Sequence, residues 1–134
     1  MLMSRLIALL LAVVVMFGMS GCGSEKEFLA AVQVTPAGGT ATAGPTKNTV
    51  QFAAIGWYAP IAGCGYGGCG LADPDKSQNL TSATWKTSDT FNTSVDANGL
   101  ASCLSPTSTP ATITATGQGG LYGPIQGTAT LLCN

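Results

Sequence analysis

The sequence predicts an all-β protein, an antiparallel sandwich of about seven short strands. Three observations lead to this fold class. After residue 19, no long stretch repeats apolar residues with the 3.6-residue period of a helix. Short segments that alternate apolar residues with threonine recur instead, and threonine favours pleated strands. Glycine, proline and asparagine separate these segments, as is typical of antiparallel sandwiches.

The expected strands follow one another closely along the chain. They cover residues 32–35, 48–58, 83–87, 93–95, 100–104, 111–116 and 125–133. The second strand is the clearest, because every second residue from Val50 to Gly56 is apolar or small and falls on one face. Between the fourth and fifth strands, Asn98-Gly99 is a strong indication of a hairpin turn.

Length and charge limit the classes of function. A chain of 134 residues is expected to form one domain. Five basic and six acidic residues give a formal net charge of −1, so we expect no nucleic-acid partner. Because the chain contains no histidine, Ser–His–Asp catalysis, Cys–His catalysis and imidazole-bound metals are excluded. We therefore expect no enzymatic activity, no cofactor and no metal.

The N-terminus has the features of a secretory signal peptide. Arg5 places a positive charge before an apolar run from Leu6 to Met19. This run has 14 residues, fewer than the ~20 that a membrane-spanning helix needs. A basic start and a short apolar core are typical of exported proteins. The alternatives are an ordinary signal peptide whose cleavage site merely lies near Cys22 and an uncleaved membrane anchor.

The residues at the end of this run resemble a bacterial lipobox. Met19-Ser20-Gly21 leads directly to Cys22. The resemblance implies cleavage before Cys22 and a diacylglyceryl group on its thiol, so that two or three acyl chains hold the protein firmly on a membrane. Gly23, rather than an aspartate, follows the cysteine. By the same resemblance, this implies the outer membrane if the source is Gram-negative.

The chain is thus expected to comprise a signal peptide (1–21), the lipidated cysteine with a short tether (22–30) and one domain (31–134). From Cys22 onward, only 19 of 113 residues are Leu, Ile, Val or Phe, and so small an apolar core needs crosslinks. Export places the four remaining cysteines in an oxidising compartment. They are Cys64, Cys69, Cys103 and Cys133. Two disulfides are expected; a zinc site or a redox-active Cys64–Cys69 pair is the weaker alternative.

Parts of the domain resemble the bacterial group 2 immunoglobulin-like domain. The pattern consists of Trp85, Ser88-Asp89, Val95-Asp96 and Gly99, with 111–115 as a further strand and 32–36 and 127–131 matching the first and last strands. The resemblance covers residues 31–134 and implies an immunoglobulin-like sandwich with Trp85 in the core. It also implies that Asp89 and Asp96 support turns by accepting hydrogen bonds from backbone N–H groups.

The same resemblance bears on the disulfides. In that topology, the loop after the second strand lies at the pole opposite the C-terminus, while Cys103 and Cys133 share the C-terminal pole. This favours the pairs Cys64–Cys69 and Cys103–Cys133, because Cα atoms much more than ~7 Å apart cannot be bridged. The loop itself, residues 59–75, is a glycine-rich excursion where relatives make a short turn.

This loop end is the candidate binding site. Trp57, Tyr58 and Tyr66 offer aromatic contact area near two acids, Asp73 and Asp75. Loops at one end of a sandwich commonly bind ligands, so we expect these residues to bind a glycan or a protein. The alternatives are that the tryptophan and its neighbouring tyrosine only cover the end of the sandwich, and that the acids form a solvated turn rather than a Ca²⁺ site.

We expect a non-catalytic envelope protein whose lipid anchor makes the membrane one partner, with the first of two functions as the leading hypothesis and the second as its alternative. The first is a surface adhesion or recognition module that uses the loop end to bind a glycan or a protein. The second is a structural or accessory lipoprotein that faces the periplasm and docks on a larger envelope complex by an exposed strand edge.

Overall fold

The computed structural model describes residues 26–44, 48–65 and 68–134. The predictions for the signal peptide (1–21), for Cys22 and for Tyr66 lie outside these residues. Within the described residues, secondary structure consists of strands joined by turns and loops, so the all-β class is confirmed. No helix in this part of the chain is long and apolar enough to cross a bilayer.

The described residues form eleven strands rather than about seven. All paired strands are antiparallel except β2 and β11, which run parallel. In chain order the strands are β1 (Glu27–Thr35), β2 (Gly38–Ala41), β3 (Thr49–Gln51), β4 (Ala53–Gly65), β5 (Gly68–Leu71), β6 (Lys76–Asn79), β7 (Thr84–Thr87), β8 (Thr93–Val95), β9 (Leu100–Cys103), β10 (Ala111–Gly120) and β11 (Gly123–Cys133).

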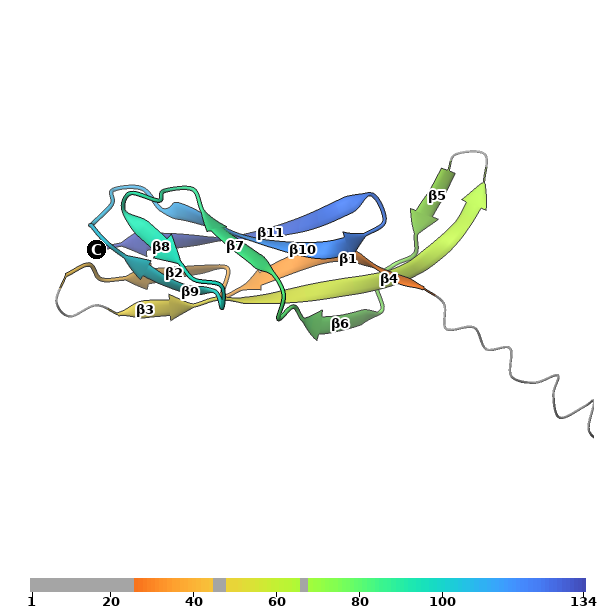
Figure 1. Cartoon of the computed structure of the whole chain (residues 1–134), viewed down its shortest axis with the longest axis horizontal. Coiled ribbons are helices and arrows are strands. Elements are labelled where there is room, and N and C mark those ends of the chain that lie inside the picture. Colours follow the sequence, from red (N-terminus) through yellow and green to blue (C-terminus); the bar gives the residue numbers. More distant parts are fainter. Residues whose placement is uncertain (1–25, 45–47, 66–67) are drawn as a thin grey trace, which may run out of the picture.

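These strands form three hydrogen-bonded sheets (Figure 1). In the first sheet, β4 pairs with β1, β5 and β6; the second has the order β2-β11-β10-β7, and the third has the order β3-β9-β8. Because only Phe52 separates β3 from β4, the third sheet follows the first along the molecule. The long strand β4 thus connects the two ends of the structure.

The core is built from alternate residues of facing strands. Phe52, Ala54 and Gly56 are all buried, whereas Ala53 is exposed and Ile55 is half-buried, which confirms the predicted alternation. The other buried hydrophobic residues of the cluster are Leu29, Val32, Val34, Ala41, Ala83, Ala101, Cys103, Ile113, Ala115, Ala129, Leu131 and Cys133. Many are alanines, so the core is as lean as the composition suggested.

Three parts of the predicted organisation are corrected. β1 begins at Glu27 and fully buries Leu29, so the tether expected at 22–30 ends earlier and the domain starts before residue 31. β2 forms because its backbone pairs with β11, although its glycines carry no alternation. The expected excursion at 59–75 contains the second half of β4 and all of β5, which pair with each other. Glycine-rich strands of this kind give no apolar pattern to recognise.

Candidate functional site

The predicted loop end is a disulfide-closed hairpin. β4 continues past its pairing with β1 and pairs with β5 at Ile61↔Leu71 and Cys64↔Cys69. The disulfide joins these two directly opposed cysteines, whose Cα atoms are 4.2 Å apart. The hairpin projects from the same end of the molecule at which β1 begins (Figure 1).

Trp57 and Tyr58 do not form a shared aromatic surface. Neighbouring residues of a strand point to opposite faces, and these two lie side by side in β4. Tyr58 packs against the core and is paired with Lys76 of β6. Trp57 is half-buried on the other face, where its cross-strand neighbours are Ala31 and Ser77. The structure therefore separates two residues that were predicted to bind together.

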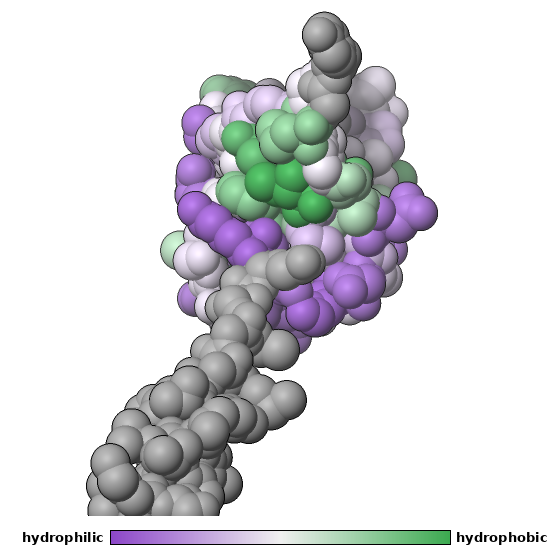
Figure 2. Space-filling model, turned by 90° about the vertical axis from the view of Figure 1, so that its right-hand side faces the viewer, coloured by the Kyte–Doolittle hydropathy of each residue, from purple (hydrophilic) through white to green (hydrophobic). Residues whose placement is uncertain are grey.

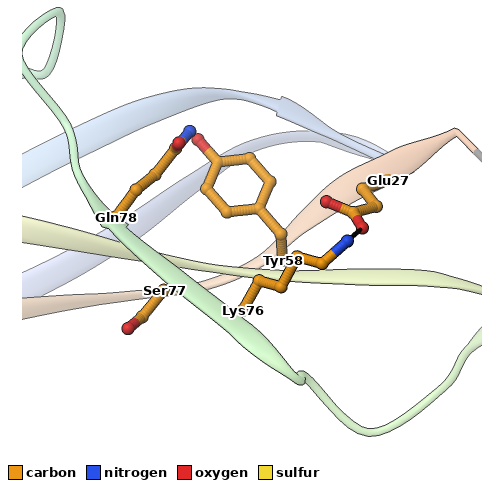
Figure 3. A pocket seen from close by; sticks show the side chains of 5 residues that line it. All are labelled: Glu27, Tyr58, Lys76, Ser77 and Gln78. Carbon is orange, nitrogen blue, oxygen red and sulfur yellow. Dashed lines mark hydrogen bonds and ion pairs between the residues drawn. The ribbon is translucent and has the colours of Figure 1, made fainter.

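Tyr58 lines a pocket of about 470 Å³ at the side of the first sheet (Figure 3). The remaining lining residues are Glu27, Lys76, Ser77 and Gln78. Lys76 and Glu27 form an ion pair, and the hydrogen bond to the Glu27 carboxylate raises the pKa of the Lys76 ammonium above its ordinary value of 10.5. Figure 3 shows the Gln78 amide beside the Tyr58 hydroxyl. An aromatic ring surrounded by hydrogen-bonding groups can hold a small polar ligand.

Asp73 and Asp75 lie in the segment that leads from β5 to β6, and both are exposed. This segment is held against β4, because the Ala72 N–H donates to the Pro60 carbonyl (2.9 Å) and the Asp75 N–H donates to the Tyr58 carbonyl (3.3 Å). Neither acid belongs to the pocket lining. In the described ranges, no three His, Cys, Asp or Glu side chains are grouped as a metal site requires.

Several residues at this end were not identified from the sequence. Glu27 precedes the alternating part of β1, and Lys76 and Gln78 lie in β6, which has no apolar alternation; only strand pairing brings these residues near Tyr58. Tyr122, in the turn between β10 and β11, donates its hydroxyl hydrogen bond to the Cys69 carbonyl. An aromatic residue inside a glycine-rich turn was the signal that could have singled it out.

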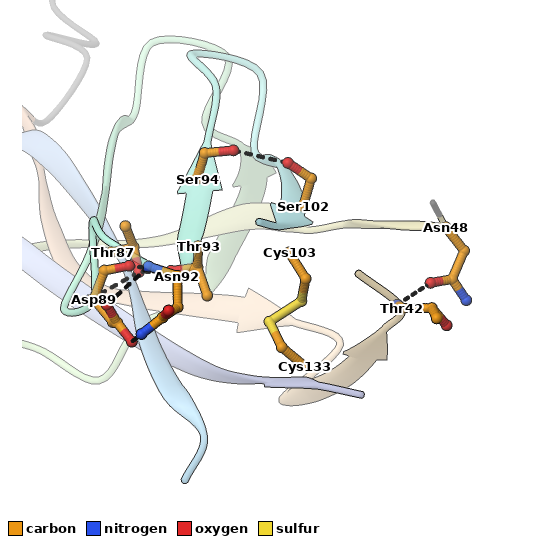
Figure 4. Close-up of a disulfide and its surroundings, with 10 residues drawn as sticks. All are labelled: Thr42, Asn48, Thr87, Asp89, Asn92, Thr93, Ser94, Ser102, Cys103 and Cys133. Atoms are coloured by element: carbon orange, nitrogen blue, oxygen red, sulfur yellow. Dashed lines mark hydrogen bonds between the residues drawn. A yellow bond between two sulfur atoms is a disulfide. The ribbon is translucent and has the colours of Figure 1, made fainter. Parts of the chain in front are cut away.

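The second disulfide lies away from the hairpin, near the C-terminus (Figure 4). Cys103 of β9 and Cys133 of β11 are both buried, with Cα atoms 5.6 Å apart. This bond joins the third sheet to the second. The structure thus contains both predicted pairs, Cys64–Cys69 and Cys103–Cys133.

The two aspartates implied to support turns do so. The Asp89 carboxylate accepts hydrogen bonds from the Asn92 side-chain amide (2.8 Å), the Asn92 N–H (3.1 Å) and the Phe91 N–H (3.2 Å). These donors, the Asn92 side chain first, lower the pKa of Asp89. Asp96 accepts from the N–H groups two and four residues further on, at 2.8 and 2.9 Å. Trp85 is half-buried and packs against the core.

A second hollow lies beside β7. It has a volume of about 460 Å³ and is lined by Trp85, Lys86, Thr87, Thr90, Thr93, Ser94 and Val95. In the described part of the chain, β7 pairs in a sheet only with β10; on its other side it faces β8 across this hollow, where the Thr87 and Thr93 hydroxyl groups are hydrogen-bonded (2.6 Å). An unpaired strand edge presents backbone donors and acceptors that can bind a further strand.

Neither models of known protein families nor curated protein sequences match this chain. The proposals below are therefore supported by its own residues and their arrangement.

Proposed function

We propose that this protein is a non-catalytic bacterial lipoprotein that docks on a larger envelope complex. Lipids on Cys22 hold it on a membrane, the outer membrane in a Gram-negative cell, with the domain in the periplasm. The lipobox-like residues Met19–Cys22 support the anchor. The facing sheets, the two disulfides and the Asp89 and Asp96 turns support an immunoglobulin-like sandwich for the domain.

The observation that carries this choice is the place where the chain enters the fold. Glu27 pairs with Pro60 at the base of the hairpin, and Cys22 precedes Glu27 by five residues. Five residues span at most ~18 Å when fully extended. An anchor on Cys22 therefore keeps the hairpin end close to the membrane, where it is poorly placed to reach a ligand on another surface. This favours the accessory function over adhesion through the loop end.

The β7 edge is the proposed docking surface, because it combines an unpaired edge with the half-buried Trp85. A photo-crosslinking amino acid at the exposed Lys86 tests this in cells that produce the full chain. We expect a discrete crosslinked complex from this position and none from the matched control at Gln33, which is exposed on β1. Absence of a complex from Lys86, or the same complex from both positions, would contradict docking through β7.

The side of the membrane is tested with an amine reagent that does not cross membranes. Lys76 is exposed and lies outside the proposed docking surface, so the reagent modifies the protein wherever it has access. A periplasmic domain should be modified only after the outer membrane is opened. Modification in intact cells would place the domain on the surface and favour recognition instead.

One observation favours recognition as the second candidate, namely the pocket beside Tyr58. If the pocket binds a glycan, Tyr58→Ala should abolish binding to an oligosaccharide array. Phe91→Ala is the matched control, because it removes an exposed aromatic ring that does not line the pocket. Equal binding by both variants would exclude this pocket as the glycan site.

A further inference from the structure

The hairpin end carries an exposed apolar surface, which we define by Ile61, Leu71 and Tyr122. Ile61 is 40% exposed and lies directly opposite Leu71 across the hairpin. Tyr122 is 85% exposed, and its hydrogen bond to the Cys69 carbonyl fixes its hydroxyl at β5. Figure 2 looks onto this end of the molecule and shows hydrophobic residues gathered there, with hydrophilic residues along the border.

The charges at this end do not point to an anionic partner. Lys26 and Lys76 are positive, while Glu27, Asp73 and Asp75 are negative, so acids outnumber bases. One of the lysines is already paired with Glu27. A partner of this surface is therefore recognised by apolar contact rather than by attraction to phosphate groups.

We propose that the hairpin-end surface rests on the bilayer in which Cys22 is anchored, with its apolar side chains in the interfacial region. This inference rests on the lipid anchor of the proposed function. The five residues from Cys22 to Glu27 allow a separation of at most ~18 Å. Beyond Pro60, the partner of Glu27, β4 runs on to Gly65, and five strand residues extend ~16 Å. The hairpin thus extends nearly as far beyond Glu27 as the fully extended tether does, so a tether short of full extension brings the hairpin end to the membrane.

The composition of the surface agrees with a membrane interface. Tyrosine is enriched where the acyl region meets water, because its ring is apolar and its hydroxyl can bond to polar groups. Among the described residues, Tyr122 is the most exposed of the large hydrophobic side chains, and the neighbouring Ile61 is aliphatic. The Cys64–Cys69 disulfide crosslinks the two strands just beyond the Ile61–Leu71 pair and so holds together the hairpin that presents these side chains.

Fluorescence quenching by brominated lipids tests the contact. The full chain is purified from the cells that produce it, and the mass of its N-terminal peptide establishes whether Cys22 is acylated. It is then reconstituted in phosphatidylcholine vesicles with or without bromine on the acyl chains. Tyr122→Trp is the probe, and Phe91→Trp is the matched control, because Phe91 is an aromatic residue of similar exposure (84%) in the turn between β7 and β8, outside the sheet that contains the hairpin. The emission of the parent, from Trp57 and Trp85, is subtracted.

We expect several-fold stronger quenching of Tyr122→Trp than of Phe91→Trp. A second pair, Ile61→Trp against Leu104→Trp (40% and 49% exposed in the parent), should behave in the same way and covers the case in which one variant fails to fold. Replacing part of the lipid with phosphatidylglycerol should leave the difference unchanged.

The outcomes separate the inference from the function on which it rests. An unacylated Cys22 would remove the anchor and with it both proposals. An acylated protein in which probe and control are quenched equally would overturn the bilayer contact and leave the anchor intact. Shielding of Tyr122→Trp from an aqueous quencher in native membranes, but not in vesicles, would identify a protein as the occupant and also overturn the inference.

Discussion

The Gly99→Ala substitution tests how tightly the β8–β9 turn is packed. Gly99 has φ = +81°, and a Cβ atom there would lie 2.5 Å from the Phe52 carbonyl oxygen and 2.8 Å from the Trp85 ring. The left-handed conformation costs an L-residue about 1–2 kcal/mol. Overpacking of a filled site costs about 1–3 kcal/mol more. Reduced freedom of the unfolded chain returns about 0.4–1 kcal/mol, so the free energy of unfolding should fall by about 2–4 kcal/mol.

Urea denaturation followed by circular dichroism measures this loss. Gly44→Ala is the matched control, because Gly44 also has a positive φ (+104°) but nothing lies within 4 Å of the added Cβ. The control therefore experiences only the conformational cost, about 1 kcal/mol. Both variants should keep the dependence on urea concentration of the parent. Equal losses in the two variants would show that contacts with Phe52 and Trp85 do not restrict position 99, and would refute the packing argument.

Three further perturbations have defined outcomes. Replacing Cys103 and Cys133 by alanine opens a 30-residue separation and should lower the free energy of unfolding by about 3.6 kcal/mol, against about 2 kcal/mol for Cys64 and Cys69, whose separation is 5; urea titration of both double variants gives the comparison, and the reverse order would contradict it. The hydrogen bonds to the Asp89 carboxylate lower its pKa below the ordinary value of 3.8. Their stabilisation of the fold is fully present at pH values above 3.8 and is lost as the pH falls through the lowered pKa of the folded state. The urea midpoint of the parent should therefore drop in acid more than that of Asp89→Asn, and parallel pH profiles would count against the turn. Phe52→Ala empties the largest fully buried site and should cost about 3–5 kcal/mol in a thermal or urea titration, whereas Phe91→Ala, at a largely exposed site, should cost little.

The sequence was a good guide to the fold wherever side chains carry the information. Alternation around Phe52 and Ala54 identified the central strand, and Asn98-Gly99 identified the β8–β9 turn, because both patterns are local. β2, β5 and β6 were not predicted, since strands that are rich in glycine or fully exposed are specified by their backbone partners β11 and β4. The start of β1 was predicted too late for the same reason, because backbone pairing of Glu27 with Pro60 extends this strand toward the N-terminus.

The candidate site was predicted less completely than the fold. Both disulfide pairs were correct, because the implied topology already separates the two ends of the domain. Trp57 and Tyr58 were placed in one binding surface, but β4 continues through both residues, so their side chains point to opposite faces of the sheet. Lys76 and Gln78 were absent from the prediction, since their position beside Tyr58 depends on the register of β6 against β4.

The two proposed contacts use different parts of the fold and should therefore be separable. β7 belongs to the second sheet, whereas the hairpin belongs to the first, and the core lies between these sheets. Tyr122→Ser removes an exposed aromatic ring from the hairpin end without touching the hollow beside β7. In this background, Ile61→Trp should lose part of its quenching by brominated lipids, while the crosslinked complex from position 86 should form as before. Loss of the complex together with the quenching would mean that the docking partner is reached only from a domain seated on the membrane, so that the bilayer contact serves to orient the β7 edge.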